Sequence, residues 1–209
     1  MRDISIPFQE NLPTWPGSTG VHFDWTLRVE RGEPSNLTRL NTDIHAGTHV
    51  EGGLHSFEKG NAIHTIPLTT LMGTVFVAHL PSAQAIGRAE LEQAGIPDGT
   101  KRILFRTKNS LLWVTGEKAF QKNFVGLTAD GAQYLVEQGI ILAGNDYLSI
   151  ARFTEGPEVH HILLKAGVTI LEGLDLHAVE QGTYQLLCLP ILLPGREAAP
   201  ARAVLLPLP

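Results

Sequence analysis

The sequence contains little cysteine and no excess of positive charge. One cysteine, Cys188, among 209 residues excludes an internal disulfide and fits a reducing cytoplasm, where we expect the protein to reside. It lies within an apolar segment, so we interpret it as a small core residue rather than a nucleophile. The formal net charge of −5 offers no basic stripe to meet phosphates, so no nucleic-acid partner is expected.

Long apolar runs are also absent. No stretch approaches the ~20 apolar residues needed to span a bilayer, and the residues from Met1 to Ser5 do not resemble a signal peptide. We therefore expect no membrane partner. A hydrophobic content of 43% and a charged content of 18% are typical of a globular protein. The length suits a single domain, 1–209, with a substantial core.

Strand-like and helix-like segments alternate along most of the chain. Helices are predicted over 88–95, 128–139 and 159–166, each followed or closed by a glycine. β-Branched, aromatic and apolar runs predict strands over 21–27, 74–80, 101–107, 140–144, 168–171, 184–189 and 201–206. This alternation is typical of an α/β protein with a parallel stretch of sheet. The β-rich ends of the chain suggest a second, mixed sheet.

What the sequence does have is a dense group of histidines. Residues 45–57 read HAGTHVEGGLHSF, which places His45, His49, Glu51 and His55 at odd positions. In a strand these side chains would leave the same face. Imidazole and carboxylate together form a ligand set for zinc, manganese or iron. A straight strand would put His45 and His49 roughly 13 Å apart, so either the chain bends at Gly47 or the two histidines serve different ions; we favour a bend.

A second group of candidate ligands lies more than a hundred residues later. His160 and His161 fall at the start of the helix predicted over 159–166, and Glu172 follows the next strand. The helix runs away from its first turn and the strand runs back, so one of these histidines can meet Glu172 at one end of the unit. The ends of strands are also where sites form in α/β sheets. The spacing alone leaves His160 and His161 as alternatives.

The run from residue 45 to 55 is similar to the His-x-Gly-Thr-His-x-Asp-x-Pro-x-His signature of the metal-dependent cyclase family, which includes bacterial kynurenine formamidase and isatin hydrolase. The resemblance covers most of the chain, because further segments match the family in order: 13–17, 102–107, 144–149, 160–174, 182–186 and 199–204. Three positions depart from the family pattern. Glu51 replaces an aspartate, Gly53 a proline and Asn145 an apolar residue, and Gly53 is expected to loosen the turn that aims His55.

The resemblance implies an α/β chain with a swivelling β/β/α fold, mixed sheets and one or two zinc or manganese ions. Its implied ligands are His45, His49, Glu51, His160 and Glu172. The twelve positions that separate the family's histidine and glutamate select His160 over His161. The resemblance also implies His55 as the residue that transfers a proton.

The expected activity is hydrolysis of a carbon–nitrogen amide or lactam bond in a small substrate, an aromatic one among the options, by metal-activated water. Trp15 and Phe8 are candidates for an apolar wall that holds this substrate, whereas core packing is the favoured interpretation of Trp25. Two alternatives remain, a metal-dependent cyclase or dehydratase and a metal-binding protein without turnover. We expect a homodimer or homotetramer.

Overall fold

Four strands lie side by side and run parallel in the computed structural model, which describes residues 1–208. They are β5 (Met72–His79), β6 (Arg102–Arg106), β7 (Leu142–Asn145) and β8 (Thr169–Glu172). Each consists largely of β-branched, leucine or other apolar residues; β7 and β8 are buried throughout, and β5 and β6 are buried in their central parts. The parallel stretch predicted from the alternation of strands and helices is thereby confirmed.

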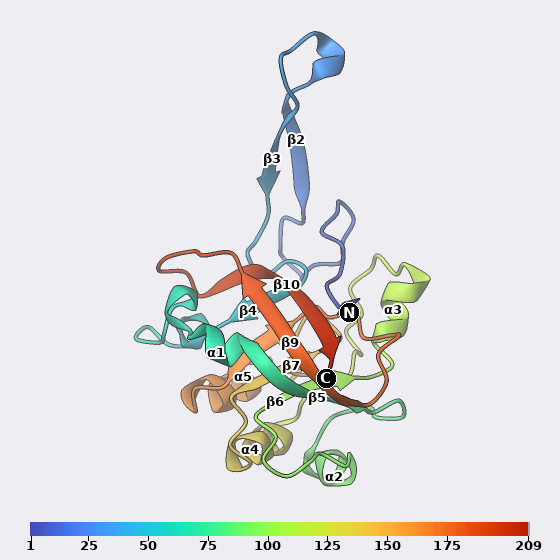
Figure 1. The fold of residues 1–209 in the computed structure, drawn as a ribbon, viewed down its shortest axis with the longest axis vertical. Coiled ribbons are helices and arrows are strands. Elements are labelled where there is room, and N and C mark those ends of the chain that lie inside the picture. Colours follow the sequence, from blue (N-terminus) through green and yellow to red (C-terminus); the bar gives the residue numbers. More distant parts are fainter. Residues whose placement is uncertain (209) are drawn as a thin grey trace.

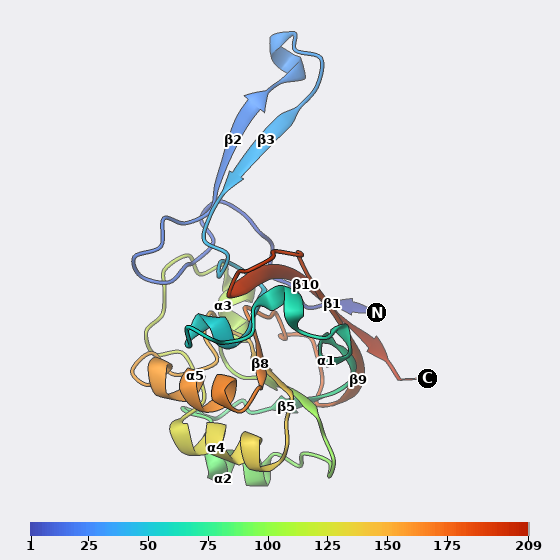
Figure 2. The same ribbon diagram turned by 90° about the vertical axis from the view of Figure 1, so that its left-hand side faces the viewer.

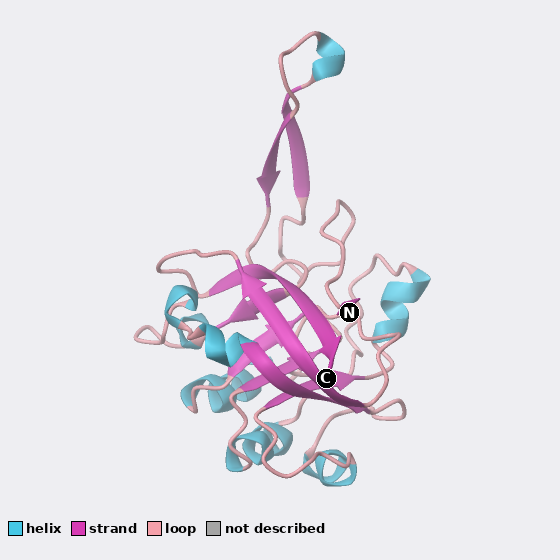
Figure 3. Ribbon diagram, in the orientation of Figure 1, coloured by secondary structure: helices cyan, strands magenta, loops and turns pink. Residues whose placement is uncertain are grey.

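Antiparallel strands close this sheet into a barrel (Figures 1 and 3). They are β4 (His49–Glu51), which pairs with β8, β10 (Ala198–Pro207), which pairs with β4, and β9 (Gly182–Pro190), which pairs with both β10 and β5. The short β1 (Arg2–Asp3) adds to the C-terminal half of β10. The strands near the C-terminus therefore join the main sheet and do not form the separate mixed sheet that the sequence suggested.

Helices cover the outside of the parallel strands. Three of them, stacked together in Figure 2, are α2 (Arg88–Gln93), α4 (Ala129–Glu137) and α5 (Gly156–Lys165). The remaining helical segments are α1 (Leu68–Leu71), α3 (Ser110–Thr115) and 3₁₀ turns at Val29–Arg31, Gly53–His55 and Ile63–Thr65. α5 begins three residues before the predicted start at 159, because Pro157 sits in its first turn, where a missing N–H costs nothing.

The alternation of side chains along each parallel strand creates two apolar cores. On β6, Ile103 and Phe105 face the helices, whereas Leu104 faces the interior of the barrel. Cys188 lies in the barrel interior with no exposed surface, and burial raises the pKa of its thiol to about 12. Its interpretation as a core residue is confirmed. No helix within residues 1–208 has both the length and the apolar character required to cross a membrane.

A hairpin of β2 (His22–Leu27) and β3 (Leu37–Asn41) forms a separate two-stranded sheet outside the barrel. It projects from the body as a long arm in Figures 1 and 2. Trp25 lies on this arm with 47% of its surface exposed, so the expectation that it packs in the core is wrong. The arm runs directly into the histidine-rich segment, since only three residues separate Asn41 from His45.

Candidate metal centre

The chain bends between the first two histidines. Gly47 has a φ of +68°, a conformation that glycine adopts readily, and a Cβ there would lie 2.8 Å from the ring of Phe8. The bend brings His45 Nδ1 to 3.2 Å from His49 Nε2. Of the two alternatives that the sequence allowed, the structure shows the bend. Phe8 packs beneath this bend and is not among the residues that line the neighbouring cavity.

Strand pairing assembles the next three candidate ligands. His49 and Glu51 leave one face of β4, with the core residue Val50 between them, and Glu172 on β8 is the register partner of His49. His49 Nε2 lies 3.3 Å from Glu172 Oε2. Two side chains from distant parts of the sequence therefore face each other directly.

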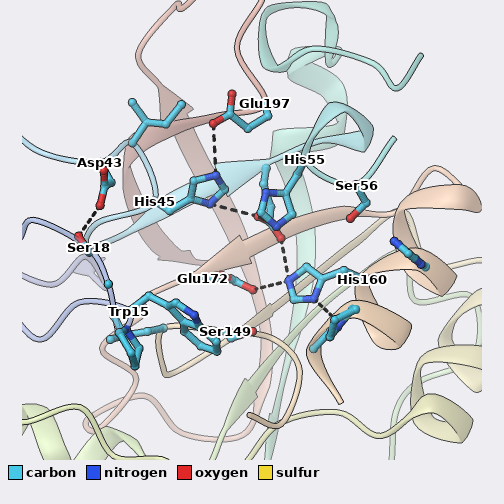
Figure 4. A pocket seen from close by; sticks show the side chains of 18 residues that line it. Trp15, Ser18, Asp43, His45, His55, Ser56, Ser149, His160, Glu172 and Glu197 are labelled. Atoms are coloured by element: carbon cyan, nitrogen blue, oxygen red, sulfur yellow. Dashed lines mark hydrogen bonds and ion pairs between the residues drawn. The ribbon is translucent and has the colours of Figure 1, made fainter. Parts of the chain in front are cut away.

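His160 completes this group from the first turns of α5, as Figure 4 shows. Its Nε2 atom is 3.1 Å from Glu51 Oε1 and 3.4 Å from Glu172 Oε1. His161 lines the same cavity, but its ring packs against Phe57 at a centroid distance of 5.2 Å. The structure thus brings His160 rather than His161 to the carboxylates, and the helix and strand return to one end as predicted.

The buried histidines are oriented by backbone carbonyl groups. His49 Nδ1 lies 3.0 Å from the carbonyl oxygen of Gly47, and His160 Nδ1 lies 2.7 Å from that of Gly156. A neutral ring that donates its Nδ1–H to a carbonyl presents an unprotonated Nε2, the form in which histidine binds metals. Glu172 is fixed as well, because Oε1 accepts a hydrogen bond of 2.6 Å from the N–H of Ile150.

His55 approaches from the 3₁₀ turn that follows β4. Its Nε2 atom lies 3.6 Å from Glu51 Oε2, and its side chain is 34% exposed. The turn is held by Asn61, whose Oδ1 accepts a 2.8 Å hydrogen bond from the N–H of Gly53, and a Cβ at Gly53 would come within 2.6 Å of that oxygen. The expectation that Gly53 loosens the turn is therefore wrong, because glycine permits this close contact.

The polar departure at Asn145 is also accommodated. Its side chain donates to the carbonyl of Ser149 and accepts from the N–H of Tyr147, so the turn after β7 carries its own hydrogen bonds. The adjacent Asp146 is fully buried and accepts hydrogen bonds from the backbone N–H groups and hydroxyls of Thr107 and Ser110. This network anchors the loop that supplies the N–H of Ile150 to Glu172.

The carboxylates and histidines of the cluster shift each other's pKa values. Burial alone would raise the pKa of Glu51, but His160 and His45 outweigh it and hold that pKa well below its usual range. At His160, burial alone would lower the pKa, but Glu51 and Glu172 outweigh this effect. The pKa of His160 therefore lies well above its ordinary value. Burial lowers the pKa of His55. Glu51 Oε1 is buried without a hydrogen-bond partner in residues 1–208, although His160 lies near it.

These residues suit a divalent metal ion. Two groups of three side chains each bring their ligand atoms within 4.8 Å of one another: His45, Glu51 and His55 form one, and His49, Glu51 and Glu172 form the other. Glu51 belongs to both groups, and the carboxylate of a glutamate has two oxygens for two neighbours. Nitrogen and oxygen donors together are a ligand set for a divalent transition metal.

A cavity of about 830 Å³ opens over the cluster, within the size range of small-molecule sites. Trp15 forms part of its wall, and its ring is backed by Phe120 at 5.1 Å and Phe153 at 5.3 Å between centroids. The structure therefore places Trp15, unlike Phe8, where a substrate would lie. Among residues 1–208 the lining contains no lysine or arginine, but it contains four carboxylates, those of Asp43, Glu51, Glu172 and Glu197.

Glu197 is a residue of the site that sequence reasoning missed. It lies just before β10, and pairing with the β4 segment is continued by a 3.0 Å hydrogen bond from the N–H of Gly52 to the Glu197 carbonyl. Its carboxylate reaches to 3.6 Å from His45 Nε2, the ring nitrogen that faces away from His49 (Figure 4). No local motif marks Glu197, since its position depends on a strand register that joins segments nearly 150 residues apart.

A closed mixed barrel with a buried histidine–glutamate cluster beneath a cavity is the arrangement of a metal-dependent enzyme. The family described as "putative cyclase" matches residues 2–152, and the chain belongs to this family. Cyclase-like protein 3 of Arabidopsis thaliana is 35% identical, over 98% of this chain and 78% of the relative.

Two further proteins are similar to this chain over nearly the whole length of both chains. A kynurenine formamidase of Bacillus cereus is 32% identical, over 99% of this chain and 97% of the relative. A solved structure described as a potential metal-dependent hydrolase with cyclase activity has a TM-score of 0.83 and 34% identity, over 98% of this chain and 96% of that one. The family resemblance and the fold that it implies are thereby confirmed.

Proposed function

We propose that this chain is a metal-dependent hydrolase that cleaves a carbon–nitrogen amide bond in a small aromatic substrate. The observation that carries the proposal is the placement of Glu51, which belongs to two groups of metal-binding side chains at the floor of a cavity. Trp15 forms part of the wall of this cavity. The likeness to a kynurenine formamidase and to a metal-dependent hydrolase supports the same reaction class.

The metal centre in this proposal consists of His45, His49, Glu51, His160 and Glu172, with zinc or manganese as the metal. A divalent ion bound by these residues would lower the pKa of a bound water molecule to near neutral pH, and the ion would also polarise a carbonyl oxygen. Because Glu51 belongs to both ligand groups, its carboxylate could supply the negative charge that two neighbouring divalent ions would require. The hydrogen bond from the N–H of Ile150 fixes the carboxylate of Glu172, one of the proposed ligands.

The remaining residues of the cavity move the proton and hold the substrate. His55 takes the proton of the attacking water and returns it to the leaving nitrogen as the carbon–nitrogen bond breaks, so that an amide gives a carboxylic acid and an amine. Trp15 offers its face to the aromatic ring of the substrate. We further place the enzyme in the cytoplasm, because its one cysteine is a buried, free thiol.

Metal content and activity test this function together. Protein purified without chelators should contain about one or two equivalents of zinc or manganese by plasma mass spectrometry, and removing the metal should lower the melting temperature, since the ion binds only the folded site. N-Formylkynurenine and isatin, an open-chain amide and a lactam, are the substrates to assay. Protein that holds no metal and gains no thermal stability on adding it contradicts the proposal.

The family description favours a second candidate, a cyclase or dehydratase that uses the same centre. In that reaction His55 shifts a proton without the addition of water. Turnover in water enriched with ¹⁸O separates the two, because hydrolysis places one labelled oxygen in the carboxylic acid product. Metal-loaded protein that binds aromatic amides without turnover would instead indicate the non-catalytic alternative.

Glu197 has a positioning role in this proposal. A carboxylate on the outer nitrogen of a metal-binding histidine fixes the ring and raises its basicity. Glu197→Ala should therefore weaken metal binding about 10–100-fold, the usual effect of losing such a partner. Chelator competition measures this change without any assay of turnover.

Two further variants serve as controls for Glu197. Glu197→Asp keeps the charge and should recover part of the metal affinity. Glu180→Ala removes an exposed carboxylate far from the cavity lining and should leave affinity unchanged. Equal metal affinity of Glu197→Ala and the parent would show that Glu197 does not act on His45.

A further inference from the structure

Asp43 is a cavity residue to which the proposed reaction gives no role. Of the four carboxylates that line the cavity within residues 1–208, Glu51 and Glu172 are proposed metal ligands. Glu197 lies 3.6 Å from His45 Nε2 and acts on that ring. The carboxylate of Asp43 contacts none of the proposed ligands among the described residues, although it lines the same cavity. Its charge therefore faces the space in which a substrate would lie.

One hydrogen bond orients the carboxylate of Asp43. Its Oδ2 atom accepts this bond from the hydroxyl of Ser18, which in turn accepts a 3.1 Å hydrogen bond from the N–H of Gly20. Within residues 1–208 this is the one hydrogen bond that the Asp43 side chain makes. A carboxylate can accept about four hydrogen bonds. Asp43 is thus held in place while its Oδ1 atom can still accept from a bound molecule.

The bond from Ser18 ties Asp43 to the turn that carries Trp15. The N–H of Ser18 donates a 3.0 Å hydrogen bond to the carbonyl of Trp15, and between them lie Pro16 and Gly17, whose φ is +96°. This is a type II turn, in which the first and last Cα atoms lie less than ~7 Å apart. Trp15, Ser18 and Asp43 therefore lie on one side of the cavity, as Figure 4 shows.

Asp43 is also close to the metal centre along the chain. It lies two residues before His45, and two residues span at most ~7 Å. The carbonyl of Asp43 accepts a 3.1 Å hydrogen bond from the N–H of Ala46, which holds the intervening segment as a turn. A substrate with its amide at the metal centre and its ring on Trp15 can therefore bring a substituent of that ring to Asp43.

An aromatic face beside a carboxylate suits a cationic substituent. An ammonium group donates charge-assisted hydrogen bonds to a carboxylate, and the negative face of an indole ring attracts it as well. A neutral substituent gains neither interaction. A carboxylate substituent would be repelled by Asp43, and the lining within residues 1–208 has no lysine or arginine to offset this repulsion. The side of the cavity that holds Trp15 and Asp43 therefore favours positive charge.

We propose that Asp43 determines the charge of the substrate, and that the preferred substrates are aromatic amides whose ring carries a substituent with an ammonium group. This inference rests on the proposed hydrolysis and adds a substrate class to it. Asp43 takes no part in breaking the carbon–nitrogen bond. It binds the cationic substituent while Trp15 holds the ring, so its contribution depends on the charge of the substrate.

Matched formanilides test the charge preference. The para-aminomethyl, para-hydroxymethyl and para-carboxyl compounds share one formamide bond and are cationic, neutral and anionic at neutral pH. Asp43→Asn should lower the ratio of kcat/KM for the cation to that for the neutral compound about 5-fold, the sum of an ion pair and a cation–π contact at a partly exposed site. It should raise the relative kcat/KM of the anion. Comparing ratios between proteins cancels the intrinsic reactivity of each amide and any change in metal content. Asp98→Asn, the same change on an exposed loop outside the cavity lining, should leave the ratios as in the parent.

Binding of benzylguanidinium gives a readout without turnover, since this cation has no amide to hydrolyse and no basic lone pair to bind a metal. Calorimetry should show that it binds the parent more tightly than neutral benzyl alcohol does, and that Asp43→Asn removes most of this difference. If no formanilide is hydrolysed while this binding depends on Asp43, the reaction is wrong and the charge preference stands. Hydrolysis with ratios that Asp43→Asn does not change would overturn the inference and leave the reaction intact. Equal binding of benzylguanidinium by the parent and Asp43→Asn would overturn it as well.

Discussion

Glu51→Gln is expected to lose most of its bound metal and, with it, most of its activity. Each oxygen of Glu51 faces a different side of the cluster: Oε2 lies 3.3 Å from His45 Nδ1, and Oε1 lies 3.1 Å from His160 Nε2. An amide keeps the shape but presents one oxygen and one NH₂ group, so it can accept on one side only and turns donor hydrogens towards the other. We expect metal affinity to fall by more than about 100-fold, beyond the usual effect of losing an outer partner.

Glu158→Gln is the matched control for this substitution. It makes the same chemical change on α5 two residues from His160, but Glu158 is exposed and does not line the cavity. Plasma mass spectrometry and melting temperature with and without metal should separate the two variants. If Glu51→Gln binds metal and turns over like the parent, Glu51 lies outside the metal shell, and a single-ion or non-catalytic protein becomes the better account.

Glu51→Asp tests whether the backbone is adapted to glutamate, whose side chain is one methylene longer than that of aspartate. The bend at Gly47 and the contact between Gly53 and Asn61 fix the positions from which the ligands start. Shortening residue 51 by one methylene should withdraw its oxygens from one of the two ligand groups and lower kcat. An increase in kcat would show instead that aspartate is the better residue on this backbone.

The parts of the site that the sequence predicts well are those that depend on local pattern. His49 and Glu51 alternate around a buried valine, so a strand of any register puts them on one face. The helix that begins near His160 and the strand that ends at Glu172 must return to the same end of the sheet, and they do. Periodicity and chain direction suffice for both inferences.

The parts that the sequence could not predict depend on tertiary pairing. Glu197 reaches His45 only because β10 pairs with β4, and nothing near residue 197 marks that register. α3 escaped prediction because its start is held by Asp146, a buried carboxylate from a different strand end. Phe8 was expected beside the substrate because it is aromatic, yet its ring is needed beneath the bend at Gly47.

The barrel shows the same limit at a larger scale. Its longer strands could be recognised along the chain, although β1 was not predicted, and closure requires β10 to pair with β4 through one segment and with β9 through another. Strand propensity does not specify partners. The sequence therefore indicated the correct class and the parallel stretch, while it misplaced the final strands in a separate sheet.

His55→Ala should keep its metal and lose turnover by about 10²–10⁴-fold, the usual contribution of a positioned proton-transfer group. His55 lies within ligand distance of Glu51 and His45, so geometry alone admits a role as a ligand. Its ring differs from those of His49 and His160, which backbone carbonyls orient. Within residues 1–208 no hydrogen bond fixes the imidazole of His55, and a third of it is open to the cavity.

Metal content separates the two roles of His55. A proton carrier can be removed without loss of metal, and added imidazole should then restore part of kcat, whereas loss of a ligand lowers metal occupancy and activity together. His79→Ala, which removes an imidazole at the far end of β5, controls for nonspecific effects. A His55→Ala protein that has lost metal but turns over normally once metal is in excess would make His55 a ligand and leave the proton to another group.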